Sequence, residues 1–158
     1  MLSDADRIRN LLGAYCERID AADFARVGEL FAAGALADPS GTVLARGAVE
    51  VEAFFRRTVR LHDGSPRTKH LVFDSVFEEQ GTGDGEPDGD AAPAPREVVV
   101  RSSFVVLQAS EAGGIDPIIA GRYVDRIARP VDRAWHFAER RFVVDLTGDL
   151  TRHLAGGP

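Results

Sequence analysis

An aspartate and a histidine, Asp20 and His70, are the residues of this chain whose types and contexts best suit chemistry. Asp20 ends an amphipathic segment and His70 opens an apolar one, so each polar group stands in a stretch otherwise built to be buried. A buried carboxylate needs a partner, because removing an unpaired charge from water costs much free energy. A carboxylate that orients an imidazole and stabilises its cation makes a general base. If the two side chains meet inside the fold, we expect an enzyme.

Both residues also have a purely structural interpretation. His70 would then be a core histidine with satisfied hydrogen bonds or the solvent-facing end of a strand, and Asp20 would cap the next helix, a role for which Asp23 competes. In the functional interpretation His70 removes a proton next to a carbonyl or a leaving group, and Asp20 fixes the tautomer of the imidazole. The sequence leaves both interpretations open.

Three N-terminal segments have helical character. In residues 4–20, six apolar side chains share one face at helical spacing: Ile8, Leu11, Leu12, Tyr15, Cys16 and Ile19. Asp23 is expected to cap a second helix that stops at Gly34, and a third helix is expected over residues 48–61. Residues 42–46 are expected to form a short strand before it. Tyr15 falls on the inward face of the first helix, one turn before Asp20.

The periodicity then changes from helical to extended. Segments rich in Val, Ile and Phe predict strands at residues 70–77, 96–108, 117–128 and 135–146. Residues 81–95 are rich in Gly, Pro and Asp, cannot build a core and are expected to form a mobile hairpin loop. Three helices followed by a long antiparallel meander predict a single α+β domain over residues 1–158, with the sheet curving around the helices.

Composition excludes several classes of protein. The 158 residues are 44% hydrophobic and 28% charged, and the net charge of −6 comes mostly from residues 81–95, so no basic footprint for nucleic acid is expected. No apolar run approaches the roughly 20 residues of a membrane span, and the N-terminus lacks the features of a signal peptide. The single cysteine, Cys16, excludes an intrachain disulfide and is expected to be a buried structural thiol. We therefore expect a cytoplasmic protein.

The sequence offers no motif for a metal or an organic cofactor. His62, His136 and His153 lack the spacing of metal ligands with one another or with nearby acids. No glycine-rich phosphate loop, serine nucleophile elbow or dinucleotide fingerprint is present. We expect chemistry that needs neither a metal nor a cofactor.

The order of the expected elements and five local motifs resemble the NTF2-like superfamily, and in particular its SnoaL-like branch. The motifs are residues 8–31, Arg-Thr-Lys-His at 67–70, Gly-Arg-Tyr-Val-Asp-Arg at 121–126, Trp-His-Phe-Ala-Glu-Arg-Arg at 135–141 and Asp-Leu-Thr-Gly-Asp-Leu at 145–150. The resemblance implies a cone, in which helices close a strongly curved, mostly antiparallel sheet over a deep pocket. Enzymes of this group include polyketide cyclases, scytalone dehydratase, ketosteroid isomerase and a dehydrochlorinase, and many of them use no cofactor.

The resemblance also implies roles for individual residues. In its dehydratase and dehydrochlorinase types, an aspartate at the end of the first helix pairs with a histidine on the strand after the third helix, and Asp20 and His70 match those positions. Pocket-lining positions of the family correspond here to Tyr15, Tyr123 and Arg140. These two tyrosines also suit an ordinary core with satisfied hydroxyls.

Alternation along the strand at 117–128 places Tyr123 inward, because it puts Arg122 and Arg126 on the other face. The adjacent pair Arg140 and Arg141 must face opposite ways, so one of them is expected at the surface or at a dimer interface. The choice of Arg140 as the inward residue rests on the resemblance.

We therefore expect a small cofactor-independent enzyme that takes a hydrophobic, cyclic, oxygenated molecule and performs dehydration, isomerisation or cyclisation. The alternative is a non-catalytic ligand-binding or assembly subunit, similar to the small subunit of ring-hydroxylating dioxygenases. In either case the exposed face of the sheet favours a homodimer or homotrimer, since large apolar patches rarely stay in water.

Overall fold

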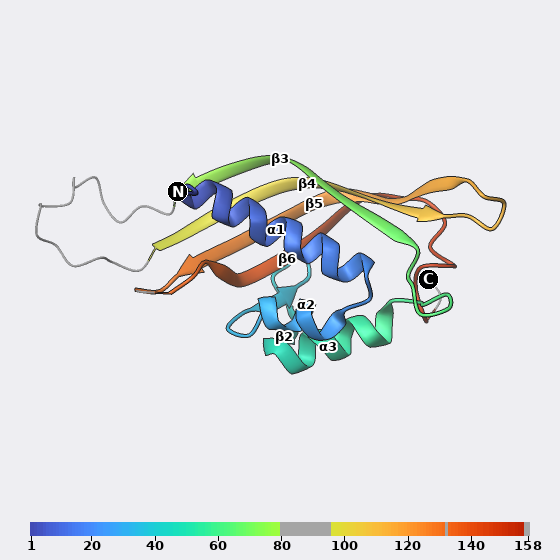
Figure 1. Ribbon diagram of the computed structural model, residues 1–158, viewed down its shortest axis with the longest axis horizontal. Helices are drawn as coiled ribbons and strands as arrows, with labels where there is room; N and C mark the ends of the chain where they lie inside the picture. The colour runs from blue at the N-terminus through green and yellow to red at the C-terminus, as the bar shows by residue number, and fades with distance from the viewer. Residues whose placement is uncertain (80–95, 132, 157–158) are drawn as a thin grey trace, which may run out of the picture.

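The computed structural model describes residues 1–79, 96–131 and 133–156, so the expected loop at 81–95 lies outside the described part. The described residues form three helices, α1 (Asp4–Asp20), α2 (Phe24–Leu30) and α3 (Gly47–Thr58), and six strands, β1 (Ala35–Ala37), β2 (Val43–Arg46), β3 (Thr68–Glu79), β4 (Arg96–Ala109), β5 (Ile115–Arg129) and β6 (His136–Thr147). The strands make one sheet in the order β2-β1-β6-β5-β4-β3, antiparallel except where β1 pairs with β6. Helices α2 and α3 pack together, while α1 runs along β3 and in front of the long strands (Figure 1).

Helix α1 follows the expected boundaries because both of its ends are defined locally. The Ser3 hydroxyl accepts a hydrogen bond from the backbone N–H of Asp6 at 3.1 Å, and the Asp6 carboxylate accepts one from the backbone N–H of Ser3 at 3.2 Å. This capping box satisfies donors that the first turn leaves free. At the other end, Ala22 adopts a left-handed conformation with φ 56°, which ends the helix just after Asp20.

Helix α2 begins as expected but ends early. The Asp23 side chain accepts a hydrogen bond from the backbone N–H of Arg26 at 3.3 Å, which confirms its role as the cap. The prediction that Gly34 stops this helix is wrong, because the helix ends at Leu30 and tight turns follow. Gly34 instead permits a close approach of strands, since a Cβ there would lie 2.0 Å from the Phe137 carbonyl oxygen.

The four long strands confirm the predicted meander, and the structure adds a strand that the sequence did not reveal. Strand β1 is short and wholly buried, so it has no alternating pattern to detect. The ladders contain bulges between Phe73 and Val76, between Val106 and Leu107, and at two positions in the β5–β6 pair, and bulges bend a sheet locally. Helix α3 ends at Thr58, three residues before the expected end at 61.

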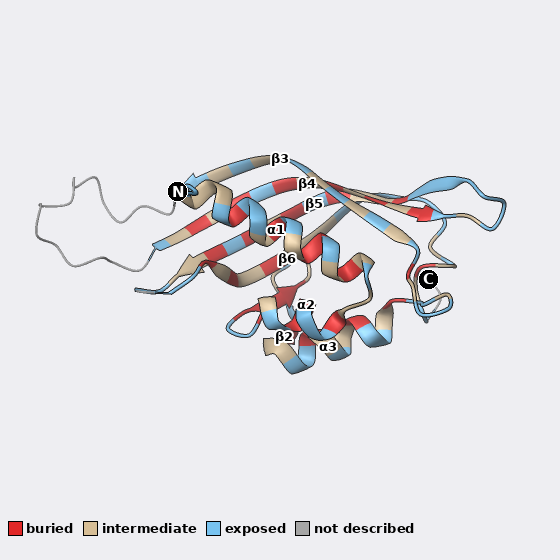
Figure 2. Cartoon of the chain, in the orientation of Figure 1, coloured by how far each residue is buried: buried red, intermediate tan, exposed pale blue. Residues whose placement is uncertain are grey.

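The core lies between the helices and the concave side of this sheet (Figure 2). The rings of Phe31 and Phe137 stack with centroids 4.7 Å apart, and Tyr15 meets both rings edge to face. Trp135 and Phe137 are also buried in this core. The α+β class and the packing of three helices on a curved sheet are therefore confirmed.

Candidate active site

The end of α1 and the start of β3 bring Asp20 and His70 into contact. The His70 Nδ1 atom lies 2.6 Å from Asp20 Oδ1, and the backbone N–H of His70 donates to Oδ2 at 2.9 Å. The Thr68 hydroxyl donates a further hydrogen bond to Oδ1 at 2.9 Å. The Asp20 and His70 side chains are only 9% and 8% exposed, so the pair is largely shielded from water.

The contacts of Asp20 define the chemistry available to the imidazole. Burial by itself raises the pKa of Asp20, but the hydrogen bonds and charge of His70, together with the Thr68 hydroxyl, lower that pKa below its ordinary value. The carboxylate therefore stays ionised, and as an acceptor it favours the imidazole tautomer with a proton on Nδ1. No described residue bonds the other ring nitrogen, Nε2, which is left to accept a proton.

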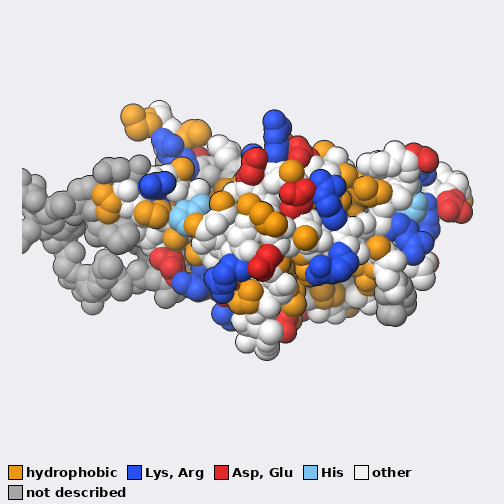
Figure 3. Space-filling model, turned by 90° about the horizontal axis from the view of Figure 1, so that it is seen from below, with side chains coloured by type: hydrophobic (Ala, Val, Ile, Leu, Met, Phe, Trp, Pro, Cys, Tyr) orange, Lys and Arg blue, Asp and Glu red, His pale blue; other side chains and the backbone are white. Residues whose placement is uncertain are grey.

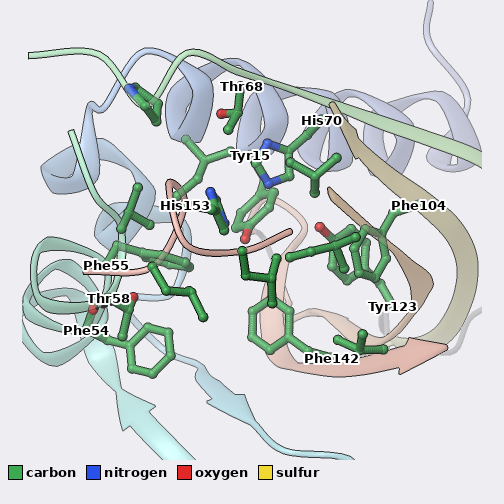
Figure 4. A pocket seen from close by; sticks show the side chains of 18 of the residues that line it. Tyr15, Phe54, Phe55, Thr58, Thr68, His70, Phe104, Tyr123, Phe142 and His153 are labelled. Carbon is green, nitrogen blue, oxygen red and sulfur yellow. Dashed lines mark hydrogen bonds between the residues drawn. The ribbon is translucent and has the colours of Figure 1, made fainter. Parts of the chain in front are cut away.

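His70 borders a cavity of about 350 Å³ that is lined by residues of α1, α3, the long strands and the C-terminal segment (Figure 4). Most of its lining is aromatic or aliphatic, including the rings of Tyr15, Phe54, Phe55, Phe104, Tyr123 and Phe142. Its polar side chains are the two tyrosines, Thr58, Thr68, Thr147, His70 and His153, and no Asp, Glu, Lys or Arg is among the described lining residues. Such a cavity suits a hydrophobic molecule bearing a few oxygen atoms.

Both predicted tyrosines lie at this cavity. The Tyr15 and Tyr123 rings meet edge to face with centroids 6.0 Å apart, and the Tyr15 ring lies 6.4 Å from that of His70. Burial raises the pKa of both phenols above the ordinary value, so the hydroxyls remain protonated and can donate hydrogen bonds. Arg122 and Arg126 face outward, as the alternation along the strand predicts.

The structure corrects the expected position of Arg140. Its guanidinium is fully buried and outside the cavity lining, where it donates two hydrogen bonds of 2.7 Å to the Asp125 carboxylate. It lies against the rings of Tyr15 and Tyr123, with Cζ 4.2 and 3.9 Å from their centroids. Burial alone would lower the pKa of Arg140, but the Asp125 carboxylate raises it above the ordinary value, so the guanidinium stays charged. Arg140 therefore lies behind the tyrosines, while Arg141 is partly exposed and pairs with Glu139.

Sequence reasoning missed two residues of this region. Asp125 shares the inward face of β5 with Tyr123, and a charge on an apolar inward face was the available signal of a buried pair. His153 was considered only as a metal ligand, whereas the structure places it in the cavity lining. The C-terminal segment that carries it has no periodic pattern, so nothing in the sequence pointed to this position.

The structure also bears on Cys16, on metal binding and on membrane-spanning helices. Cys16 is a buried free thiol, and burial raises its pKa to about 11, as suits a structural residue. Within the described residues, no group of three His, Cys, Asp or Glu side chains is arranged to hold a metal ion. No helix in the described ranges has the length and apolar character needed to cross a membrane.

Residues 1–141 match the sequence profile of the SnoaL-like domain. The chain belongs to the SnoaL-like family. Among solved structures, it is similar to Rv3472, a protein of unknown function from Mycobacterium tuberculosis, with 29% identity and a TM-score of 0.62 over 88% of this chain and 70% of that one. No curated protein matches this chain in sequence.

Two further structures from Novosphingobium aromaticivorans share the fold of this SnoaL-like chain. A proposed scytalone dehydratase is 16% identical with a TM-score of 0.63, and the match covers 92% of this chain and 86% of that one. The beta subunit of a proposed aromatic-ring-hydroxylating dioxygenase is 17% identical with a TM-score of 0.59, and the match covers 90% of each chain. These comparisons confirm the NTF2-like fold that the motifs implied.

Proposed function

We propose that this SnoaL-like protein is a cofactor-independent enzyme in which His70 removes a carbon-bound proton from a hydrophobic, cyclic, oxygenated substrate. The observation that carries the proposal is the 2.6 Å contact of His70 Nδ1 with Asp20, which leaves Nε2 without a described hydrogen-bond partner on a ring that lines the cavity. Asp20 holds the imidazole in the required tautomer and stabilises its cation once the proton has moved. The similarity to a proposed scytalone dehydratase supports this class of reaction.

In the proposed step, the proton and the electron pair both have defined acceptors within the cavity. The proton passes from a carbon next to a carbonyl to Nε2, and the electron pair of the broken C–H bond moves to the carbonyl oxygen as an enolate. A phenol hydroxyl of Tyr15 or Tyr123 donates a hydrogen bond to that oxygen as charge develops on it. Arg140 touches the tyrosine rings and not the cavity, so its role is to position these phenols. Loss of a leaving group, reprotonation elsewhere or ring closure would then give dehydration, isomerisation or cyclisation.

A proton-exchange experiment tests this step without knowledge of the natural substrate. Beta-tetralone, a bicyclic ketone with an acidic C–H bond beside its carbonyl, is incubated with the protein in deuterated buffer and followed by NMR. We expect the wild type to accelerate exchange of that proton and His70→Gln to reduce the rate to that of buffer, with little change in melting temperature. A His70→Gln variant that exchanges as fast as the wild type would eliminate His70 as the base.

The second candidate is a non-catalytic assembly subunit, favoured by the similarity to a dioxygenase beta subunit. In that case Asp20 and His70 serve only to satisfy each other inside the fold. An obligatory larger partner in native material, with no proton exchange by the isolated chain, would support this candidate.

A homodimer or homotrimer remains our prediction for the isolated chain. Exposed apolar side chains on the sheet, such as Leu71 and Phe73 on β3 and Leu146 on β6, are the surface we expect to be covered. On the face shown in Figure 3, acidic and basic side chains intermingle, so that face offers no basic stripe for nucleic acid. Sedimentation velocity measures the oligomeric state directly.

A further inference from the structure

A second imidazole, that of His153, faces the same cavity and has no role in the proton transfer proposed above (Figure 4). The residue is only 7% exposed, and its Nδ1 atom is buried without a hydrogen-bond partner among the described residues. A buried polar atom with no partner costs free energy, so it calls for a specific explanation. The other ring nitrogen, Nε2, is not among the buried unpaired atoms and also has no hydrogen-bond partner among the described residues. Because the ring lines the cavity, a ligand held there is the partner available to this imidazole.

Backbone hydrogen bonds hold the segment around His153 in place. The lack of a partner for its Nδ1 atom is therefore not explained by a poorly anchored chain end. The backbone N–H of His153 donates to the Leu150 carbonyl at 2.9 Å, and its carbonyl accepts from the backbone N–H of Arg60 at 2.8 Å. The neighbouring carbonyl of Arg152 accepts from the Gln108 side chain at 3.3 Å. These bonds tie the C-terminal turn to the residues after α3 and to β4, and they hold in place the backbone that carries the imidazole.

The two imidazoles of the cavity differ in their electrostatic surroundings. Burial and the neighbouring His70 lower the pKa of His153 to about 4, so its ring is neutral near pH 7 and offers one N–H donor and one acceptor nitrogen. His70 instead has the Asp20 carboxylate beside it, which stabilises a positive charge. Only His70 is therefore equipped to carry the proton, and His153 is equipped to form neutral hydrogen bonds.

We propose that His153 is a substrate-binding residue that hydrogen-bonds to a second oxygen of the substrate, distinct from the oxygen activated near His70. The inference deepens the proposed function and takes from it only that this cavity holds the substrate. Val59, Leu150 and Leu154, which also line the cavity, are apolar, so a substrate oxygen beside them would find its partner in the imidazole. The favoured ligands are thus hydrophobic ring compounds with two oxygen functions.

Binding of unreactive probes tests the inference. Naphthalene, the naphthols and the isomers of dihydroxynaphthalene are titrated by fluorescence against the wild type, His153→Phe and the control His136→Gln, whose residue lies outside the described cavity lining. We expect at least one dihydroxy isomer to bind the wild type and the control about tenfold more tightly than the naphthols, an increment typical of one hydrogen bond. His153→Phe should lose this gain and keep its affinity for naphthalene. Absence of the gain in the wild type, or its persistence in His153→Phe, would overturn the inference.

A measurement on the unmodified protein covers the case in which His153→Phe does not fold. Heteronuclear NMR of the imidazole nitrogens should show the His153 signal shifting when the tightest dihydroxynaphthalene binds and staying in place with naphthalene. An unmoved His153 signal at saturation with that isomer would also overturn the inference. Because these probes undergo no reaction, their binding does not depend on His70 acting as a base. A negative result in the proton-exchange experiment would therefore leave the test of His153 valid.

Discussion

The Nδ1 atom of His70 lies 2.6 Å from a carboxylate oxygen of Asp20, although the two residues are 50 positions apart in the chain. Asp20 ends α1, and His70 is the third residue of β3, so the meeting depends on how the helix is laid along the edge strand. The backbone N–H of His70 also binds Asp20, which fixes the carboxylate relative to the strand as well as to the ring. Two hydrogen bonds therefore hold Asp20 against His70, as the proposed general base requires.

Replacing the carboxylate of Asp20 should impair exchange more than stability. Asp20→Asn keeps the size of the side chain but removes the charge that stabilises the imidazolium, so we expect the exchange rate of beta-tetralone to fall by about 100-fold. Asp23→Asn alters another aspartate near the same helix end, where it caps α2, and is the matched control. Exchange rates from NMR and melting curves are measured for the wild type, Asp20→Asn and Asp23→Asn. Equal loss in both variants would point to a structural effect.

The tyrosine hydroxyls should matter for the developing charge. We expect Tyr15→Phe or Tyr123→Phe to lower the exchange rate by about 100-fold, because removing one donor to an oxyanion typically has that effect. Affinity for naphthalene, measured by fluorescence, should stay unchanged, because the apolar lining is preserved. If both variants exchange like the wild type, the tyrosines serve only the core.

The buried pair of Arg140 and Asp125 should be coupled in stability. Arg140→Met leaves the Asp125 carboxylate buried without its partner, and we expect a loss of about 3–5 kcal/mol in the free energy of unfolding. The double variant Arg140→Met with Asp125→Leu should recover much of this loss, because neither charge is then left alone. Urea unfolding of the wild type, both single variants and the double variant measures the coupling. Additive losses would contradict it.

His153 should make the protein less stable as the pH falls. Its pKa drops from an ordinary 6.5 to about 4 on folding, so the unfolded chain binds the proton more readily. The stability that its neutral form provides is complete above pH 6.5 and is lost as the pH falls toward 4, with a limiting slope of about 1.4 kcal/mol per pH unit.

Comparing the free energy of unfolding of the wild type with that of His153→Phe isolates the pH dependence that His153 contributes. Free energies of unfolding, measured in urea at several pH values in that window, should fall more steeply for the wild type. Parallel curves for the two proteins would show that His153 titrates alike in the folded and unfolded chains.

Much of the fold was predictable because its signals are local. The apolar period that ends at Ile19, the cap at Asp23 and the change to β-rich segments each depend on a few neighbouring residues. Strand β1 escaped prediction because three buried residues carry no period, and Gly34 was misassigned because its role is a contact with Phe137, far along the chain. The pairing of Asp20 with His70 was anticipated from burial, chemistry and resemblance together.

The sequence by itself determined the helices, the meander, the absence of an intrachain disulfide and the choice of Asp20 and His70 as candidates, since periodicity and residue chemistry are written in the chain. Only the tertiary structure placed Arg140 behind the tyrosines with Asp125 and brought His153 into the cavity. Side-chain alternation tells which face of a strand a residue occupies but not what the opposite wall presents. The residues on the opposite wall depend on how the bent sheet packs against the C-terminal turn.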